Sequence, residues 1–154
     1  MSTHQRSLAR EFAFQFMFHL QLPIFEEKKA SLTTNYQESE LGLLYKEIKM
    51  TINAELALDQ ENFALTIIKA TLKNYQSIQS LIEKNLTNWK LDRISKVDFT
   101  ILLTALAELL YHKDTPDKVV INEAIELAKK FGSEESANFI NGMVDRINKS
   151  KTND

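Results

Sequence analysis

The sequence predicts an all-helical domain. The chain has 154 residues but only three glycines and two prolines, and a β-rich fold of this length needs more turn-forming residues. Hydrophobic residues make up 44% of the chain and charged residues 26%, which is typical of a globular domain with a buried core. Apolar residues also recur at the three- and four-residue spacing of amphipathic helices. We expect six or seven helices in a single domain.

The first predicted helix covers residues 5–22. One side of it carries an apolar stripe with helical spacing, and Pro23 ends it because proline cannot continue a helix. The stripe consists of Ala9, Phe12, Ala13, Phe16, Met17 and Leu20.

The next part of the chain is less regular. Residues 24–58 include the cluster Thr33, Thr34 and Asn35, which predicts a loop, and residues 36–57 have a weak helical pattern. Residues 59–86 then predict one long helix, with Asp59 as its N-cap.

The most apolar helix is predicted to begin at Ser95. Ser95 and Asp98 have the spacing of a helix start, and the segment from there to about His112 is apolar nearly all round, so it should be central. Two charged residues interrupt it. Asp98 belongs to the cap, and Glu108 should accept hydrogen bonds from a neighbouring helix because a buried carboxylate needs partners.

Two further helices follow. Thr115 should cap the first of them with Pro116 at its first position, and Gly132 should end it in the left-handed conformation. Ser133 should cap the last helix. We expect a folded domain over residues 1–148 and a flexible tail over residues 149–154.

The composition argues against most kinds of catalytic site. The chain has no cysteine, and its three histidines are not spaced as zinc ligands. Its three glycines cannot form a phosphate-binding loop, and Glu123 and Glu126, one turn apart, are more simply explained as surface or hydrogen-bonding residues. We therefore predict no metal, no cofactor and no enzyme activity. The net charge of −2 also limits any nucleic-acid site to a local patch.

The first helix carries a candidate for that patch. Arg6, Arg10, Phe14 and Phe18 follow one another at four-residue steps, and at about 100° per residue the two rings lie roughly opposite the apolar stripe. Arginines can bind phosphates, and exposed rings can stack on bases or fill a pocket in a partner. The alternative is that another helix or a second subunit covers these rings. If Arg10 faces solvent, Arg10→Ala should weaken RNA binding with little loss of stability.

The last third of the chain resembles the NusB family of transcription antitermination factors. The resemblance covers roughly two-thirds of the chain and is strongest between Leu91 and Ile147. It is carried by Asp114-Thr115-Pro116, by the segment from Val120 to Gly132 (VINEAIELAKKFG) and by Phe139-Ile140-Asn141-Gly142. It implies a fold of two packed three-helix bundles. It also implies a protein without catalytic activity that binds boxA RNA together with the ribosomal protein NusE and joins elongating RNA polymerase.

The resemblance also implies which residues bind. It assigns Phe14 and Phe18 to the protein partner or its border with RNA. Packing or capping is an equally good explanation for Phe139 and Asn141. The residues implied for RNA are Arg6, Arg10, Lys129, Lys130, Asn138, Phe139 and Asn141.

The chain departs from the family pattern at four positions. Ser7, Leu8, Phe99 and Leu103 stand where the family usually has basic residues. RNA binding by this chain alone should therefore be weak, and the partner should matter more.

Two other readings of the chain remain. One is a non-catalytic scaffold of the same fold that buries Phe14 and Phe18 in a homodimer and has lost RNA binding. The other is the NusB-like domain that precedes RNA methyltransferases, although this chain has no room for a methyl-donor domain. With neither a secretion signal nor a membrane span in the sequence, we expect a cytoplasmic protein that does not bind membranes.

Overall fold

The computed structural model describes residues 1–87 and 91–152 and is helical, as predicted. The sequence also predicts a short connection at Trp89, and this residue lies outside the described residues. Eight α-helices are present in the described part of the chain, one more than the upper end of the predicted range. They are α1 (Thr3–Leu20), α2 (Glu26–Thr34), α3 (Glu38–Ile52), α4 (Leu58–Lys73), α5 (Tyr75–Asn85), α6 (Lys96–Tyr111), α7 (Asp117–Phe131) and α8 (Ser136–Thr152). Two short 3-10 helices cover Pro23–Phe25 and Leu91–Arg93.

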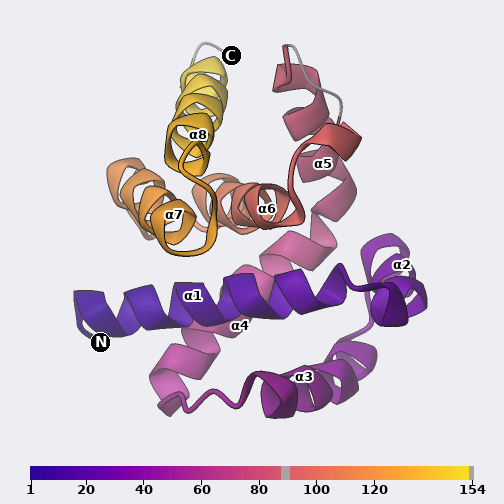
Figure 1. The fold of residues 1–154 in the computed structure, drawn as a ribbon. Coiled ribbons are helices and arrows are strands. Elements are labelled where there is room, and N and C mark those ends of the chain that lie inside the picture. Colours follow the sequence, from indigo (N-terminus) through magenta and orange to yellow (C-terminus); the bar gives the residue numbers. More distant parts are fainter. Residues whose placement is uncertain (88–90, 153–154) are drawn as a thin grey trace.

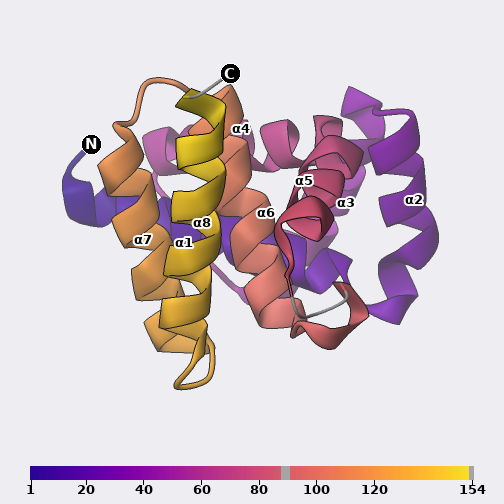
Figure 2. The same cartoon turned by 90° about the horizontal axis from the view of Figure 1, so that it is seen from above.

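The helices form two groups that share α1 (Figure 1). In one group α6, α7 and α8 pack together, and α5 lies against α6 and α8. In the other, α1 packs most extensively on α4 and also contacts α3. Because α1 also runs against α6 and α7 (Figure 2), it connects the two groups.

The core is centred on α6. Every side chain from Thr100 to Leu109 is buried, which confirms the central position predicted from its apolar sequence. Ser95 caps this helix as expected, since its hydroxyl accepts a hydrogen bond from the backbone N–H of Asp98 at 3.0 Å. Among the described helices, none combines the length and the apolar character that crossing a membrane requires.

Residues 24–58 are more regular than predicted. The Thr33 and Thr34 hydroxyls donate to the backbone carbonyls of Lys29 and Ala30, so both threonines belong to the last turn of α2 and the predicted loop is shorter. The next segment forms α3, whose buried side is Leu41, Leu44, Tyr45 and Ile48.

The single long helix predicted over residues 59–86 is in fact two helices. The chain bends at Asn74, where φ is −117° and ψ is 18°, and the Asn74 amide donates to the Ala70 carbonyl at 2.8 Å. Asp59 is also not the N-cap of α4. Ala57 holds that position, and the Gln60 side chain accepts its N–H.

The helix ends near the C-terminus differ from the predictions by one to three residues. Pro116, rather than Thr115, is the N-cap of α7. Gly132 is not left-handed, since its φ is −95°. Instead, a Cβ at Gly132 would lie 2.5 Å from the Cβ of Ser136. The last helix begins at Ser136, and the Ser133 N–H donates to the Ser136 hydroxyl. Residues 149–152 of the predicted tail lie in α8.

Candidate nucleic-acid interface

Arg10 is a buried residue of α1. Its side chain reaches α6, where Nε and Nη2 each donate to a carboxylate oxygen of Glu108 at 2.8 Å. Arg10 is 5% exposed and Glu108 is 2% exposed. Glu108 thus accepts hydrogen bonds from a neighbouring helix, as predicted. A buried carboxylate is tolerated here because a planar guanidinium satisfies both of its oxygens.

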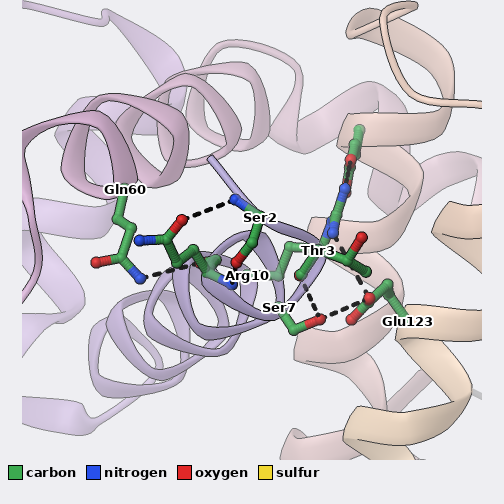
Figure 3. A network of polar contacts seen from close by, with 8 residues as sticks. Ser2, Thr3, Ser7, Arg10, Gln60 and Glu123 are labelled. Carbon is green, nitrogen blue, oxygen red and sulfur yellow. Dashed lines mark hydrogen bonds and ion pairs between the residues drawn. The ribbon is translucent and has the colours of Figure 1, made fainter.

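A second carboxylate and a ring complete the surroundings of Arg10. Glu123 of α7 lies 3.7 Å from Arg10 Nη1 and accepts a hydrogen bond from the Ser7 hydroxyl at 2.7 Å. The ring of Phe63 lies under the guanidinium, with its centroid 5.0 Å from Arg10 Cζ. Figure 3 shows how Ser7 and Arg10 converge on α7, which fixes the first turns of α1.

On the opposite side, α1 is tied to α4. The Gln60 side chain of α4 donates to the backbone carbonyl of Gln5 at 3.1 Å (Figure 3). The N-terminal half of α1 is therefore held from two sides.

These contacts contradict the predicted exposure of Arg10. The spacing places Arg10 correctly beside the apolar stripe, but α6 and α7 cover that side of α1 as well. A residue that is paired twice and buried is not free to contact a phosphate. Arg10 does not face solvent, so the condition under which Arg10→Ala was expected to cause little loss of stability is not met.

Phe14 is buried too. It is 2% exposed, and its ring centroid lies 5.0 Å from that of Phe131 at the end of α7. Phe18 lies 6.0 Å from Phe14 and is only half-buried. Because α7 covers Phe14, the predicted contact of Phe14 with a protein partner is wrong. The alternative of a homodimer that buries both Phe14 and Phe18 therefore keeps only Phe18. Phe18 retains accessible surface.

Lys129 and Lys130, two of the three exposed basic candidates, line one groove between α1 and α7. Arg6 is exposed near the start of α1, and Lys129 and Lys130 are exposed near the end of α7. The groove between these helices has His4, Leu8 and Leu127 in its lining. Arg6 is not among its lining residues; at about 100° per residue it points about 160° away from Leu8, toward another side of α1.

The lysines of this groove are paired with carboxylates. Lys130 pairs with Glu11 of α1, and Lys129 lies 3.4 Å from Glu126. All of these side chains except Glu11 are more than half exposed, so the pairs are of the weak surface type that phosphates can displace. The groove is lined by both acidic and basic side chains, so its surface is mixed in charge and is not a basic patch.

The other predicted residues lie elsewhere. Asn138 and Phe139 line a second groove, between the end of α5 and α8. Asn141 is exposed on α8. The same groove contains Arg146, whose guanidinium donates to the Asn85 carbonyl at 2.6 Å. Arg146 was not among the predicted residues, although its position two turns after Asn138 and Phe139 was a usable signal.

The four departures from the family pattern differ in their surroundings. Leu103 is completely buried, and Phe99 is half-buried with its ring 6.3 Å from that of Tyr75. The Ser7 hydroxyl donates a hydrogen bond to Glu123. Leu8 is 40% exposed in the α1–α7 groove. Of the four, Leu8 is the position where a basic side chain would most directly reach solvent.

The comparisons with known proteins agree with one another. The model of the NusB family matches residues 7–149. The transcription antitermination protein NusB of Clostridium botulinum is 39% identical over 144 residues, which cover 92% of this chain and 96% of that protein.

Solved structures show the same likeness. T. maritima NusB has a TM-score of 0.74 and 33% identity, and the match covers 97% of this chain and 93% of that one. A chain in the crystal structure of the antitermination factors NusB and NusE in complex with dsRNA has a TM-score of 0.76 and 26% identity, with 97% and 99% coverage.

Proposed function

The chain belongs to the NusB family, and we propose that it acts as a transcription antitermination factor. In this proposal it binds boxA-type single-stranded RNA together with ribosomal protein NusE and joins elongating RNA polymerase, which supports transcription of ribosomal RNA. The observation that carries the proposal is the likeness over 97% of the chain to a protein of a NusB–NusE–dsRNA complex. The role is non-catalytic and cytoplasmic, because nascent transcripts and ribosomal proteins meet there.

The proposed RNA contacts fall into two sets. Lys129 and Lys130 supply positive charge in the α1–α7 groove, and Arg6 supplies it on another side of α1. Asn138, Phe139 and Asn141 supply hydrogen-bonding groups and a ring on α8, which suits unpaired bases whose edges and faces are accessible. Arg10 acts as a positioning residue that fixes α1 against α6 and α7.

The proposed partner contact centres on Phe18. A half-buried ring can add to a protein interface without being part of the core. Because Arg10 is engaged internally and Ser7 and Leu8 are not basic, RNA binding by this chain alone should be weak and should have a shallow dependence on salt. NusE then supplies contacts that the chain lacks.

A titration tests the proposal. Fluorescent boxA RNA is titrated with the chain, with and without NusE, at two salt concentrations. We expect NusE to tighten binding at least about tenfold, the equivalent of about 1.4 kcal/mol. Unchanged RNA affinity on addition of NusE contradicts the proposal.

Variants then assign the surface. Lys129→Ala and Lys130→Ala should each weaken RNA binding of the complex, whereas Lys28→Ala on α2 should not, although Lys28 is also half exposed and paired with a carboxylate. If all three variants bind alike, the α1–α7 groove is not the RNA surface.

A further inference from the structure

The two lysines of the α1–α7 groove are paired in different ways. Lys130 of α7 pairs with Glu11 of α1, so this ion pair joins the two helices that form the groove. Lys129 pairs with Glu126, which lies three residues earlier on the same helix, at 3.4 Å. Only the first pair therefore places a carboxylate of one helix on a lysine of the other.

The two carboxylates also differ in their freedom to move. The side chain of Glu11 is 18% exposed, whereas that of Glu126 is 69% exposed. An exposed glutamate can turn into water when another anion takes its lysine. Glu11 is largely covered, so its carboxylate stays close to Lys130.

The groove has no surplus of positive charge that could offset Glu11. Its lining contains three carboxylates, those of Glu11, Glu123 and Glu126, against two lysines. Glu123 is satisfied within the protein, because it accepts a hydrogen bond from Ser7 and lies 3.7 Å from Arg10. A phosphate that binds Lys130 therefore takes the cation paired with Glu11 and leaves two anions close together, which is unfavourable.

We propose that Glu11 limits the affinity of this chain for RNA by competing with phosphate for Lys130. The inference rests on the proposed RNA-binding function and names a residue that sets the strength of binding at this groove. In the free protein Lys130 pairs with Glu11. In the complex an RNA phosphate takes the place of that carboxylate, and the like charges that remain side by side weaken binding.

A titration of the complex with NusE tests the proposal, with fluorescent boxA RNA at low salt. Glu11→Gln should tighten binding about threefold, a size typical of an ion pair near the protein surface. Glu11→Ala should have a similar effect, because both substitutions remove the charge and only one adds an amide. Circular dichroism confirms that the variants are folded.

Glu47→Gln is the matched control. It removes the same charge and frees Lys28, a half-exposed lysine outside the groove that is paired at 3.3 Å. RNA affinity should not change. Equal tightening by Glu11→Gln and Glu47→Gln overturns the proposal, because the net charge of the protein then accounts for the effect.

A double-mutant cycle with Lys130→Ala tests whether Glu11 acts through Lys130. Without the lysine, Glu11→Gln should tighten binding no more than Glu126→Gln, which removes a carboxylate from the same groove. Glu126→Gln should have the same effect with and without Lys130. If Glu11→Gln tightens binding equally in both backgrounds, Glu11 does not compete for Lys130 and the proposal is overturned.

The natural complex separates failure of this inference from failure of the proposed function. If it does not bind boxA RNA, the proposed function is overturned and this inference with it. If it binds and neither Glu11→Gln nor Glu11→Ala changes the affinity, only the role of Glu11 is overturned.

Discussion

The guanidinium of Arg10 and the carboxylate of Glu108 form a two-bonded pair between α1 and α6, and both residues are nearly inaccessible to solvent. We expect Arg10→Ala to destabilise the fold by about 3–5 kcal/mol, because it leaves a carboxylate buried without its partner. Urea unfolding followed by circular dichroism measures the loss. Arg10→Met with Glu108→Leu removes both charges and should recover most of it. A loss below about 1 kcal/mol for Arg10→Ala contradicts this account.

Glu108 is also the residue from which this pair was predictable in part. A carboxylate inside a helix that is apolar all round requires a partner, and the sequence analysis expects one on a neighbouring helix. The sequence pattern did not identify Arg10 as the hydrogen-bond donor to Glu108. A helical projection gives the direction of Arg10 and Phe14 but not how many sides of α1 are covered, and α1 is covered by α4 on one side and by α6 and α7 on the other.

Leu8→Arg should tighten RNA binding by the isolated chain. Leu8 is exposed in the α1–α7 groove, and each added phosphate contact to single-stranded RNA should steepen the dependence of log K on log salt by about 0.7. The measurement is an RNA titration at several salt concentrations. Ile24→Arg adds the same charge at an exposed residue outside the groove and should change neither affinity nor slope. Equal effects of the two substitutions argue against a local RNA site at α1.

Phe18→Ala should weaken association with NusE by at least about tenfold, the cost typical of an interface anchor. Its effect on stability should be smaller than the roughly 3–5 kcal/mol of a fully buried phenylalanine, because the ring is half-buried. Calorimetric titration measures the affinity. Phe99→Ala removes another half-buried ring and serves as the control. A core-sized loss of stability with unchanged affinity assigns Phe18 to the core.

Acid should remove the contribution of Glu61 to stability. Lys49 of α3 donates to Glu61 of α4, and this hydrogen bond lowers the pKa of Glu61 below its ordinary value of 4.5. The contribution is therefore complete above pH 4.5 and is lost as the pH falls through the lowered value. The difference in urea midpoint between the natural chain and Glu61→Gln should shrink from neutral pH to about pH 3. Glu55→Gln, at an exposed residue, is the comparison. If the difference in urea midpoint does not change with pH, the ion pair between Lys49 and Glu61 is not its cause.

Gly132→Ala should destabilise the fold by about 1–3 kcal/mol. The added methyl would lie 2.5 Å from Ser136 Cβ and 2.8 Å from the Ala128 carbonyl oxygen, so the turn between α7 and α8 would have to open. Thermal unfolding measures the change. Gly142→Ala has no such contact and should instead stabilise α8 by about 0.5–1 kcal/mol. If both substitutions change stability in the same direction, backbone entropy rather than close approach determines both changes.

The positions that the sequence predicts least well are those that depend on a local turn. The bend at Asn74 has neither glycine nor proline beside it, so the apolar pattern continues across it from α4 into α5. By contrast, the burial of α6 follows directly from its lack of a polar face. The same limit applies to the candidate binding residues. Periodicity places Lys129 and Asn138 on helices, but it does not show that they line different grooves.

The pairing of α1 with distant segments has a consequence for synthesis on the ribosome. Arg10 is 98 residues from Glu108, and Ser7 is 116 residues from Glu123. At about 5–20 residues per second, α1 waits roughly 5–20 s before α6 and α7 have been made. During that time its aromatic side chains and its arginine have only part of their final contacts. We expect the nascent chain to need protection from aggregation in this interval, and codon choice between α1 and α6 to affect the yield of folded protein.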